Sequence, residues 1–313
     1  MAYLLRDKRE ELDRQISMLA ARGTPDFLLC GMRLYGPVEP ALLNAARDIV
    51  ASVPRDAERG GDARRVDAAA FAERARHEIE RYRRDHADVT STVSILDDMV
   101  GLMVSRGHLL VGHALALRAD RVEPLIHHEV GTHVLTYCNG AAQPLRQLRL
   151  GLADYDELQE GLAVLAEYLV DGLSRARLRL LAARVLAVHS MVEGASFVET
   201  FRLLRKDHGF GPGAAFSTTT RVHQSGGFSR DMIYLRGLLH LMAFLADGGA
   251  LEPLYVGKIA LKHVPVLDEL RDRQVLREPP LRPAFLDLAG AAERLDAVRH
   301  GLPVARLVRG AKR

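Results

Sequence analysis

The feature that most constrains this chain is a pair of segments between residues 121 and 172 that together carry a metal-ligand pattern. The first contains His128, Glu129 and His133, and the second contains Glu160 within the letters QEGLA. Two imidazoles and a carboxylate are a common ligand set for a catalytic zinc ion, which keeps a fourth position open for water. Glu129 directly follows the first histidine, so its carboxylate would lie beside the metal and could accept a proton from the water. These residues predict a metal-dependent hydrolase.

The spacing of the two histidines is unusual. In the common H-E-x-x-H pattern the histidines are four residues apart, but here position 132 is Thr and the second histidine is at 133. On a regular α-helix, at about 100° per residue, His133 would lie roughly 140° from His128. A single π-type turn would return both rings to one face, and such turns favour functional sites. We therefore predict a π turn here, with Gly131 easing the distortion.

Both segments are predicted to be helical. The first helix is expected to begin near Pro124 and to end at residues 139–140, which are Asn and Gly. The second is expected to begin with a capping box at Asp154 and to carry a leucine stripe. Glu167 lies two turns beyond the QEGLA glutamate, and we predict that it orients His133 through the other ring nitrogen.

An ordinary surface helix can also carry His-Glu-x-x-x-His, so the pattern alone is a weak signal. The chain contains a similar dipeptide, His77-Glu78, but Arg81 and Tyr82 stand where a second histidine would be needed. The first site differs because apolar residues surround its ligands and a second carboxylate helix follows. These two features favour metal binding over a solvated helix face.

Three stretches of the chain resemble a known family. HEVGTH, LQEGLAVLAEYL and RVHQSGGFSRDMIYLRGL are similar to the QEGLA-motif proteins, a bacterial group labelled flavohemoglobin expression-modulating and related to the tubulin-tyrosine carboxypeptidase MATCAP. The resemblance runs from residue 90 to residue 290. It implies Zn²⁺ bound by His128, His133 and Glu160, with Glu129 as the catalytic residue.

A second polar set follows the metal motifs. We interpret the Gly-, Ser- and Thr-rich residues 211–228 as a loop leading into a helix capped by Ser229. Cationic and phenolic side chains there could bind a substrate carboxylate or stabilise an oxyanion, with Asp231 as their orienting partner. The alternative is a salt-bridged helix N-terminus in which Asp231 is favoured by the macrodipole. Family members carry Arg before the paired glycines, where this chain has Gln224. The candidate substrate-binding residues are Arg221, His223, Arg230 and Tyr234.

Composition limits the possible partners. The chain has 313 residues, of which 48% are hydrophobic, enough for one large or two modest domains. Its 43 basic and 40 acidic residues give a net charge of +3, so the whole-protein charge gives no case for nucleic acid. The first residues lack the pattern of a secretory signal, and we find no uncharged apolar run of about 18 residues, so no membrane span is expected. Two cysteines suit a reducing compartment, which predicts a cytoplasmic protein.

The expected fold is a mostly helical α+β protein. Alternating apolar residues predict a small sheet near residues 89–111, just before the metal helix, and the glutamate helix would complete the site. This architecture is similar to the zincins with a distal glutamate ligand. The strands could receive an extended peptide at an exposed edge or could simply support the helix. The expected helices span 3–21, 38–52, 68–86, 173–190 and 195–207.

We expect three parts along the chain. A helical N-terminal segment would span 1–88 and include an exposed linker at 55–65. A metallopeptidase-like catalytic domain would span 89–300, and a disordered basic tail 301–313.

Two functions follow from this interpretation. The first is a zinc peptidase, by resemblance a carboxypeptidase that removes a residue from the C-terminus of a peptide or protein. The second is a zinc-containing regulatory or binding protein that keeps the site without turnover.

Overall fold

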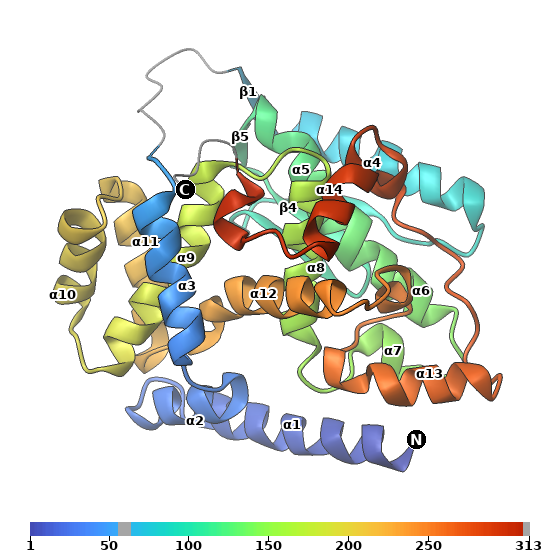
Figure 1. Ribbon diagram of the computed structural model, residues 1–313, viewed down its shortest axis with the longest axis horizontal. Coiled ribbons are helices and arrows are strands. Elements are labelled where there is room, and N and C mark those ends of the chain that lie inside the picture. Colours follow the sequence, from blue (N-terminus) through green and yellow to red (C-terminus); the bar gives the residue numbers. More distant parts are fainter. Residues whose placement is uncertain (56–63, 309–313) are drawn as a thin grey trace. The chain divides into compact units, whose positions relative to one another are not determined.

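The computed structural model describes residues 1–55 and 64–308 (Figure 1). The chain forms two compact units, the first from Met1–Ala57, Ser174–Leu239 and Pro303–Arg313, and the second from Glu58–Leu173 and His240–Leu302. As predicted, the protein is mostly helical with small sheets. The functional division expected at residues 88 and 300 stays a prediction, and most of the expected linker, residues 56–63, lies outside the described residues.

The first unit is built around the helix α9 (Arg175–Val192). Buried leucine, valine and alanine side chains lie on most sides of this helix, which makes it a central element that packs against both α3 and α11. The helix α2 was not expected from the sequence. The helices of this unit are α1 (Ala2–Ala20), α2 (Asp26–Tyr35), α3 (Pro40–Ser52), α9, α10 (Phe197–Arg202), which continues into a π-helical turn (Leu203–Asp207), and α11 (Pro212–His223).

The predicted loop at residues 211–228 is wrong for most of its length, because α11 occupies Pro212–His223. Pro212 stands at the first helical position, where its missing N–H costs nothing. The buried side chains are Ala215, Thr218, Thr219 and Val222, a helical spacing of three and four residues. The hydroxyl groups of the two threonines made this buried face hard to recognise in the sequence.

The predicted Ser229 cap is also wrong. Ser229–Met232 forms a 3₁₀ turn, and the helix α12 (Ile233–Ala246) follows it. The Ser229 hydroxyl is buried and makes no hydrogen bond to the described residues. The α12 helix passes from the first unit into the second.

The second unit contains the predicted sheet. Its three strands are β2 (Val93–Leu96), β3 (Leu102–Ser105) and β4 (His108–Gly112), in the order β2-β4-β3. The central strand β4 pairs parallel with β2 and antiparallel with β3. Gly112 has to be glycine, because a Cβ there would lie 2.4 Å from the Met99 carbonyl oxygen. A second sheet of β1 (Arg65–Asp67) and β5 (Ala116–Arg118) was not predicted.

The helices of the second unit position the metal motifs. The helix α5 packs against α8, and this close approach requires Gly172, whose Cβ would lie 2.1 Å from Pro124 Cγ. Every residue of α8 from Leu158 to Leu169 is buried, so its glutamates must find partners inside the protein. The main helices are α4 (Ala68–Asp85), α5 (Val122–His128), α6 (Leu135–Ala141), α7 (Gln147–Leu150), α8 (Tyr155–Leu169), α13 (Val264–Asp272) and α14 (Ala291–Arg299).

Three predicted boundaries need correction. The capping box at Asp154 is absent: this residue has a left-handed backbone (φ 56°), and its carboxylate accepts from Lys262 Nζ at 2.6 Å. The helix α6 ends at Ala141, one residue beyond the expected stop. In the predicted tail, Val304–Leu307 forms a 3₁₀ turn against α3, while residues 309–313 lie outside the described residues.

Within residues 1–55 and 64–308, no helix combines the length and the apolarity that crossing a bilayer requires.

Candidate metal centre

The turn between the two histidines is π-helical, as their spacing predicted. His128 is the last residue of α5, Glu129–Val134 forms the π segment, and α6 follows without a break. The two imidazole rings come together with centroids 5.2 Å apart. Thr132, which replaces the histidine of the common motif, donates its hydroxyl to the His127 carbonyl at 3.1 Å. This bond ties the Thr132 side chain to the backbone at the start of the π segment.

Gly131 serves packing in this turn. A Cβ on this residue would lie 3.3 Å from the Phe285 ring and 3.4 Å from His127 Nδ1, so any larger side chain has to displace one of them. His127 is not part of the metal cluster, and its ring packs edge-on against Phe285, with ring centroids 5.6 Å apart. The histidine pair at 127–128 therefore contributes one residue to the cluster and one to the core.

His128, His133 and Glu160 form a cluster that can hold a metal ion. Each offers one ligand atom, and the three atoms lie within 4.8 Å of one another. The Nε2 atom of His128 lies 3.7 Å from Glu160 Oε2, and that of His133 lies 3.8 Å from the same oxygen. Glu160 comes from α8, so the packing of α5 against α8 assembles the cluster.

Glu167 supports His128, whereas the sequence had assigned it to His133. Its Oε1 lies 3.0 Å from His128 Nδ1, and its Oε2 accepts from Arg121 Nη2 at 2.7 Å. Arg121 also donates to the Gly172 carbonyl at 2.9 Å. The reversal follows from where the ring Nδ1 atoms lie: that of His128 contacts Glu167 in the second half of α8, and that of His133 contacts Gln159 in its first half.

His133 is supported by neutral groups. Its Nδ1 lies 3.4 Å from Gln159 Oε1, and that oxygen also accepts from the Thr136 hydroxyl at 2.8 Å. Because the amide oxygen can only accept, this arrangement favours a proton on Nδ1 and leaves the Nε2 lone pair directed at Glu160. The two ligand histidines are thus held by a charged partner in one case and by an amide in the other.

This difference in partners separates the pKa values of the two histidines. Burial lowers the pKa of His133 to about 4, despite the nearby carboxylate of Glu160, so this ring is neutral at neutral pH. Burial also acts to lower the pKa of His128, but the hydrogen bond with Glu167 and the charges of Glu129 and Glu160 outweigh it and raise that pKa. Of the two histidines, His128 is therefore the one at which a bound proton would compete with a metal ion.

Glu129 is the first residue of the π segment. Its side chain is buried, and its charge contributes to the raised pKa of His128, so the carboxylate lies within electrostatic reach of the ligands. The similar dipeptide at 77–78 has no such surroundings. His77 is exposed beside Glu73, and Glu78 is bound to Arg74.

Lys258 lies near this cluster and was missed in the sequence. Burial lowers its pKa, against the favourable charges of Asp156 and Glu160. Its ammonium nitrogen lies 5.4 Å from the centre of the Tyr155 ring. Roughly a hundred residues separate it from the QEGLA segment, and no local pattern marks it, so only the fold identifies it.

The predicted substrate-binding residues all belong to the first unit, whereas the metal cluster belongs to the second. The predicted pairing of Arg221 with Asp231 is present, with Nε 2.5 Å from Oδ2 and Nη2 2.7 Å from Oδ1. Arg230 adds its charge near both groups. His223 Nε2 lies 3.0 Å from the Thr200 hydroxyl.

Arg184 completes this group and was also missed. It lies 3.8 Å from the Asp231 carboxylate, and its guanidinium lies 4.7 Å from the centre of the Tyr234 ring. Its Nε and Nη1 make no hydrogen bond to the described residues. Burial lowers its pKa even though Asp231 opposes this effect.

One family model, described as microtubule-associated tyrosine carboxypeptidase (MATCAP), matches residues 1–302. The chain belongs to the MATCAP family. Neither the curated proteins nor the solved structures gave a significant match. Membership implies a carboxypeptidase-like enzyme that acts on a peptide or protein. It also extends the relationship to the N-terminal helices, which the resemblance over residues 90–290 had not covered.

Proposed function

We propose that this protein is a zinc-dependent carboxypeptidase that removes a C-terminal residue, with tyrosine on a protein C-terminus as the substrate that the family description suggests. The proposal of a bound metal ion rests on one observation: the Nε2 atoms of two histidines both lie near the same Glu160 oxygen. The two cysteines, Cys30 and Cys138, are both free, in keeping with the cytoplasmic location that we retain as part of the proposal.

The donor set fits zinc. Zinc bonds of about 2.0–2.2 Å at tetrahedral angles place ligand atoms roughly 3.3–3.6 Å apart. The two histidine–Glu160 separations of 3.7 and 3.8 Å need to shorten by a few tenths of an ångström, and all three ligand atoms lie within 4.8 Å of one another. Calcium and magnesium prefer all-oxygen ligands, which this cluster does not offer.

The chain's own residues account for the proton transfers. A zinc ion bound by the cluster would polarise the scissile carbonyl and acidify the attacking water. Glu129 accepts the proton from that water and later delivers it to the leaving amine nitrogen. Glu167 and Gln159 keep the two imidazoles in the orientation that ligation needs.

The substrate carboxylate needs a cation, because a buried carboxylate without a partner costs several kcal/mol. We propose Arg221 and Arg230 for this task, with Tyr234 and His223 as further contacts. Lys258 is a second candidate, since it lies in the same unit as the ligands and near Glu160. Activity on free and amidated peptides, compared between Arg221→Ala and Lys258→Met, distinguishes the two cations: the variant that lacks the carboxylate contact loses the preference for a free C-terminus.

Digestion of a peptide library, read by mass spectrometry, tests the activity. We expect loss of single C-terminal residues by the wild type and no loss with Glu129→Gln, which keeps its metal. Metal analysis should show near-stoichiometric zinc that disappears in His128→Ala and remains in the exposed control His77→Ala. Stoichiometric zinc with no cleavage would favour the alternative of a regulatory protein, and internal cleavage would contradict the carboxypeptidase assignment.

A further inference from the structure

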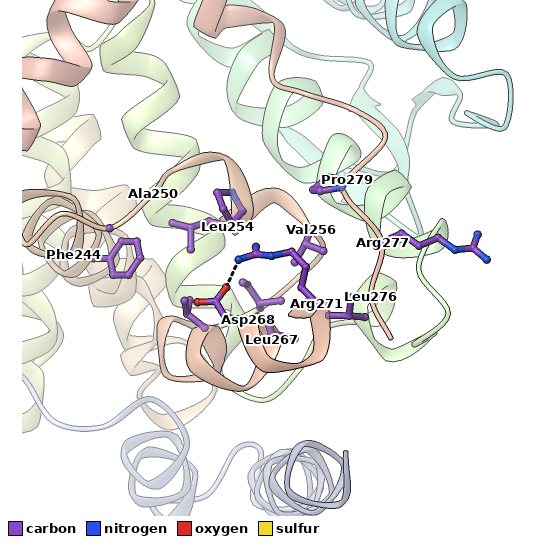
Figure 2. Close-up of a pocket in the computed structure, with 14 residues that line it drawn as sticks. Phe244, Ala250, Leu254, Val256, Leu267, Asp268, Arg271, Leu276, Arg277 and Pro279 are labelled. Carbon is purple, nitrogen blue, oxygen red and sulfur yellow. Dashed lines mark hydrogen bonds and ion pairs between the residues drawn. The ribbon is translucent and has the colours of Figure 1, made fainter. Parts of the chain in front are cut away.

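The second unit contains a cavity, and none of the residues of the metal cluster lines it. It is a cavity of about 260 Å³ between α12, the segment 249–259, α13 and residues 276–279. Figure 2 shows apolar side chains around it, among them Leu254, Val256 and Leu267. An apolar cavity of about 150 Å³ accepts benzene, so this one has room for a longer aliphatic chain.

Two charged side chains that bond to each other, Asp268 and Arg271, lie among these apolar groups. The guanidinium of Arg271 extends toward the centre of the site, where its Nη2 donates to Asp268 Oδ1 at 2.8 Å (Figure 2). A guanidinium has five N–H donors, and this is its only hydrogen bond to the described residues. Arg277 also belongs to the lining, but its guanidinium points away from the cavity in Figure 2, so Arg271 supplies the cationic group that faces it.

Buried amides hold the walls of the cavity in place. Asn139 donates to the carbonyls of Tyr255 and Leu281 at 2.8 and 2.9 Å, and accepts from the Leu281 N–H at 3.0 Å. Gln143 makes two bonds with the backbone of Arg277, both at 2.9 Å. The backbone at Tyr255, Arg277 and Leu281 is therefore fixed to α6 and to the residues that directly follow it. A cavity with fixed walls cannot collapse to recover the packing energy it lacks, whereas a ligand can recover it.

We propose that this cavity binds a medium-chain aliphatic monocarboxylate. The chain would lie among Leu254, Val256 and Leu267, and the carboxylate would accept hydrogen bonds from the unused donors of Arg271. Burial of each methylene is favourable, and the charge-assisted contact fixes the head group. This site is separate from the proposed peptidase site and does not depend on it.

The absence of tryptophan from the chain allows a direct test. Phe244→Trp places a fluorophore on the cavity wall, and Phe216→Trp places one at a position that is 57% exposed in the first unit. Bromodecanoate, used below its micelle concentration, should quench the first variant saturably and the second only weakly and linearly. Equal quenching of both would overturn the proposal.

Two substitutions in the Phe244→Trp background test the head group and the chain. Arg271→Gln should weaken bromodecanoate binding at least tenfold, and bromodecanol should bind at least tenfold more weakly than bromodecanoate. Ala250→Phe, at an exposed position on the rim, should abolish binding. Equal affinity for acid and alcohol, or binding that survives Ala250→Phe, would contradict the assignment.

A measurement on the unaltered chain covers the case in which the tryptophan variant does not fold. Decanoate should raise the thermal unfolding midpoint of the native sequence by ligand linkage, and it should not do so for Ala250→Phe. An unchanged midpoint for the native protein at saturating decanoate would overturn the proposal.

Discussion

Two buried carboxylates, one in each unit, are held by arginine in different ways. Glu167, fully buried in α8, accepts from Arg121 through one oxygen and contacts the His128 ring through the other. Asp231, also buried, has both oxygens occupied by Arg221 and has Arg184 nearby. The first carboxylate therefore transmits its charge to a ligand of the metal cluster. The second is surrounded by cations and compensates their charge.

The comparison shows that the role of a carboxylate–guanidinium pair depends on the third group near the carboxylate, which is the His128 ring for Glu167 and Arg184 for Asp231. A neutral ring next to Glu167 becomes a better oriented and more basic ligand. A second guanidinium next to Asp231 makes that carboxylate the counter-charge of two arginines, and its removal leaves the largely buried Arg184 unpaired in charge. We therefore expect changes at Asp231 to act on stability and changes at Glu167 to act on metal affinity.

The largest effect is expected from Asp231→Ala. Removal of this carboxylate leaves the largely buried Arg184 without its counter-charge, and the expected cost is up to about 3–5 kcal/mol, the range for a fully buried pair. Denaturant unfolding of the metal-free protein measures the loss. Metal affinity of the folded fraction should stay within a factor of two, because the ligands belong to the other unit. A large loss of metal affinity would contradict the expectation that Asp231 acts on stability alone.

The same carboxylate has a defined pH dependence. Burial acts to raise the pKa of Asp231, but Arg221, Arg184 and Arg230 outweigh it, so the pKa is lowered. A lowered folded-state pKa contributes stability above the unfolded-state pKa of about 3.9, and this contribution is lost as the pH falls through the folded value. In Asp231→Asn that acid-dependent step should be missing from the stability curve.

The second effect is expected from Glu167→Gln, which keeps the shape of the side chain and removes its charge. Loss of such an outer partner lowers metal affinity about 10–100-fold. Competition with a chelator at fixed pH measures the change. Gln143→Ala serves as a control. Gln143 bonds to the backbone of Arg277 and not to a residue of the metal cluster, so metal affinity should stay unchanged. An unaltered affinity in Glu167→Gln would remove the distinction between the two carboxylates.

The third effect concerns pH and metal binding. The pKa of His128 is raised, so below that pKa a proton competes with the metal, and affinity should fall by up to about tenfold per pH unit. In the metal-free protein the protonated ring contributes stability below the unfolded-state pKa of about 6.5, and this contribution is lost as the pH rises through the folded value. In Glu167→Gln both transitions should move to lower pH, as chelator titration and unfolding curves can show.

The smallest effect is expected at the other histidine. Gln159→Ala removes a neutral contact of 3.4 Å to His133, and we expect metal affinity to fall less than about tenfold. The pH dependence should stay as in the wild type, because His133, with a pKa of about 4, is already neutral. If Gln159→Ala lowered metal affinity as much as Glu167→Gln, the charge of Glu167 would not be what makes its contact with His128 more important than the contact of Gln159 with His133.

Much of the candidate metal cluster could be predicted from local sequence spacing. Two histidines five positions apart come together on a helix when the turn between them is π-helical, and the π segment Glu129–Val134 provides that turn. The QEGLA glutamate follows on the next long helix, so its participation was also predictable. The orienting role of Glu167 was predicted for the wrong histidine, because sequence spacing does not tell which half of α8 meets which turn.

Residues with no local pattern could not be found from the sequence. Arg121, Arg184 and Lys258 gain their roles from partners 46, 47 and roughly a hundred residues away, respectively. The helix α11 was missed because threonine occupies part of its buried face. In both cases burial decides the role of the side chain, and burial is a property of the packed chain.

The sequence by itself determined the residue types of the candidate metal cluster, the π turn between its histidines and the helical character of the chain, since each follows from neighbouring residues. Only the tertiary structure decided which carboxylate supports which histidine and which arginines gather around Asp231. It also decided that the predicted substrate residues and the metal ligands belong to different compact units. The physical reason is that orientation, desolvation and charge compensation depend on contacts between distant segments, and those contacts exist only after the helices have packed.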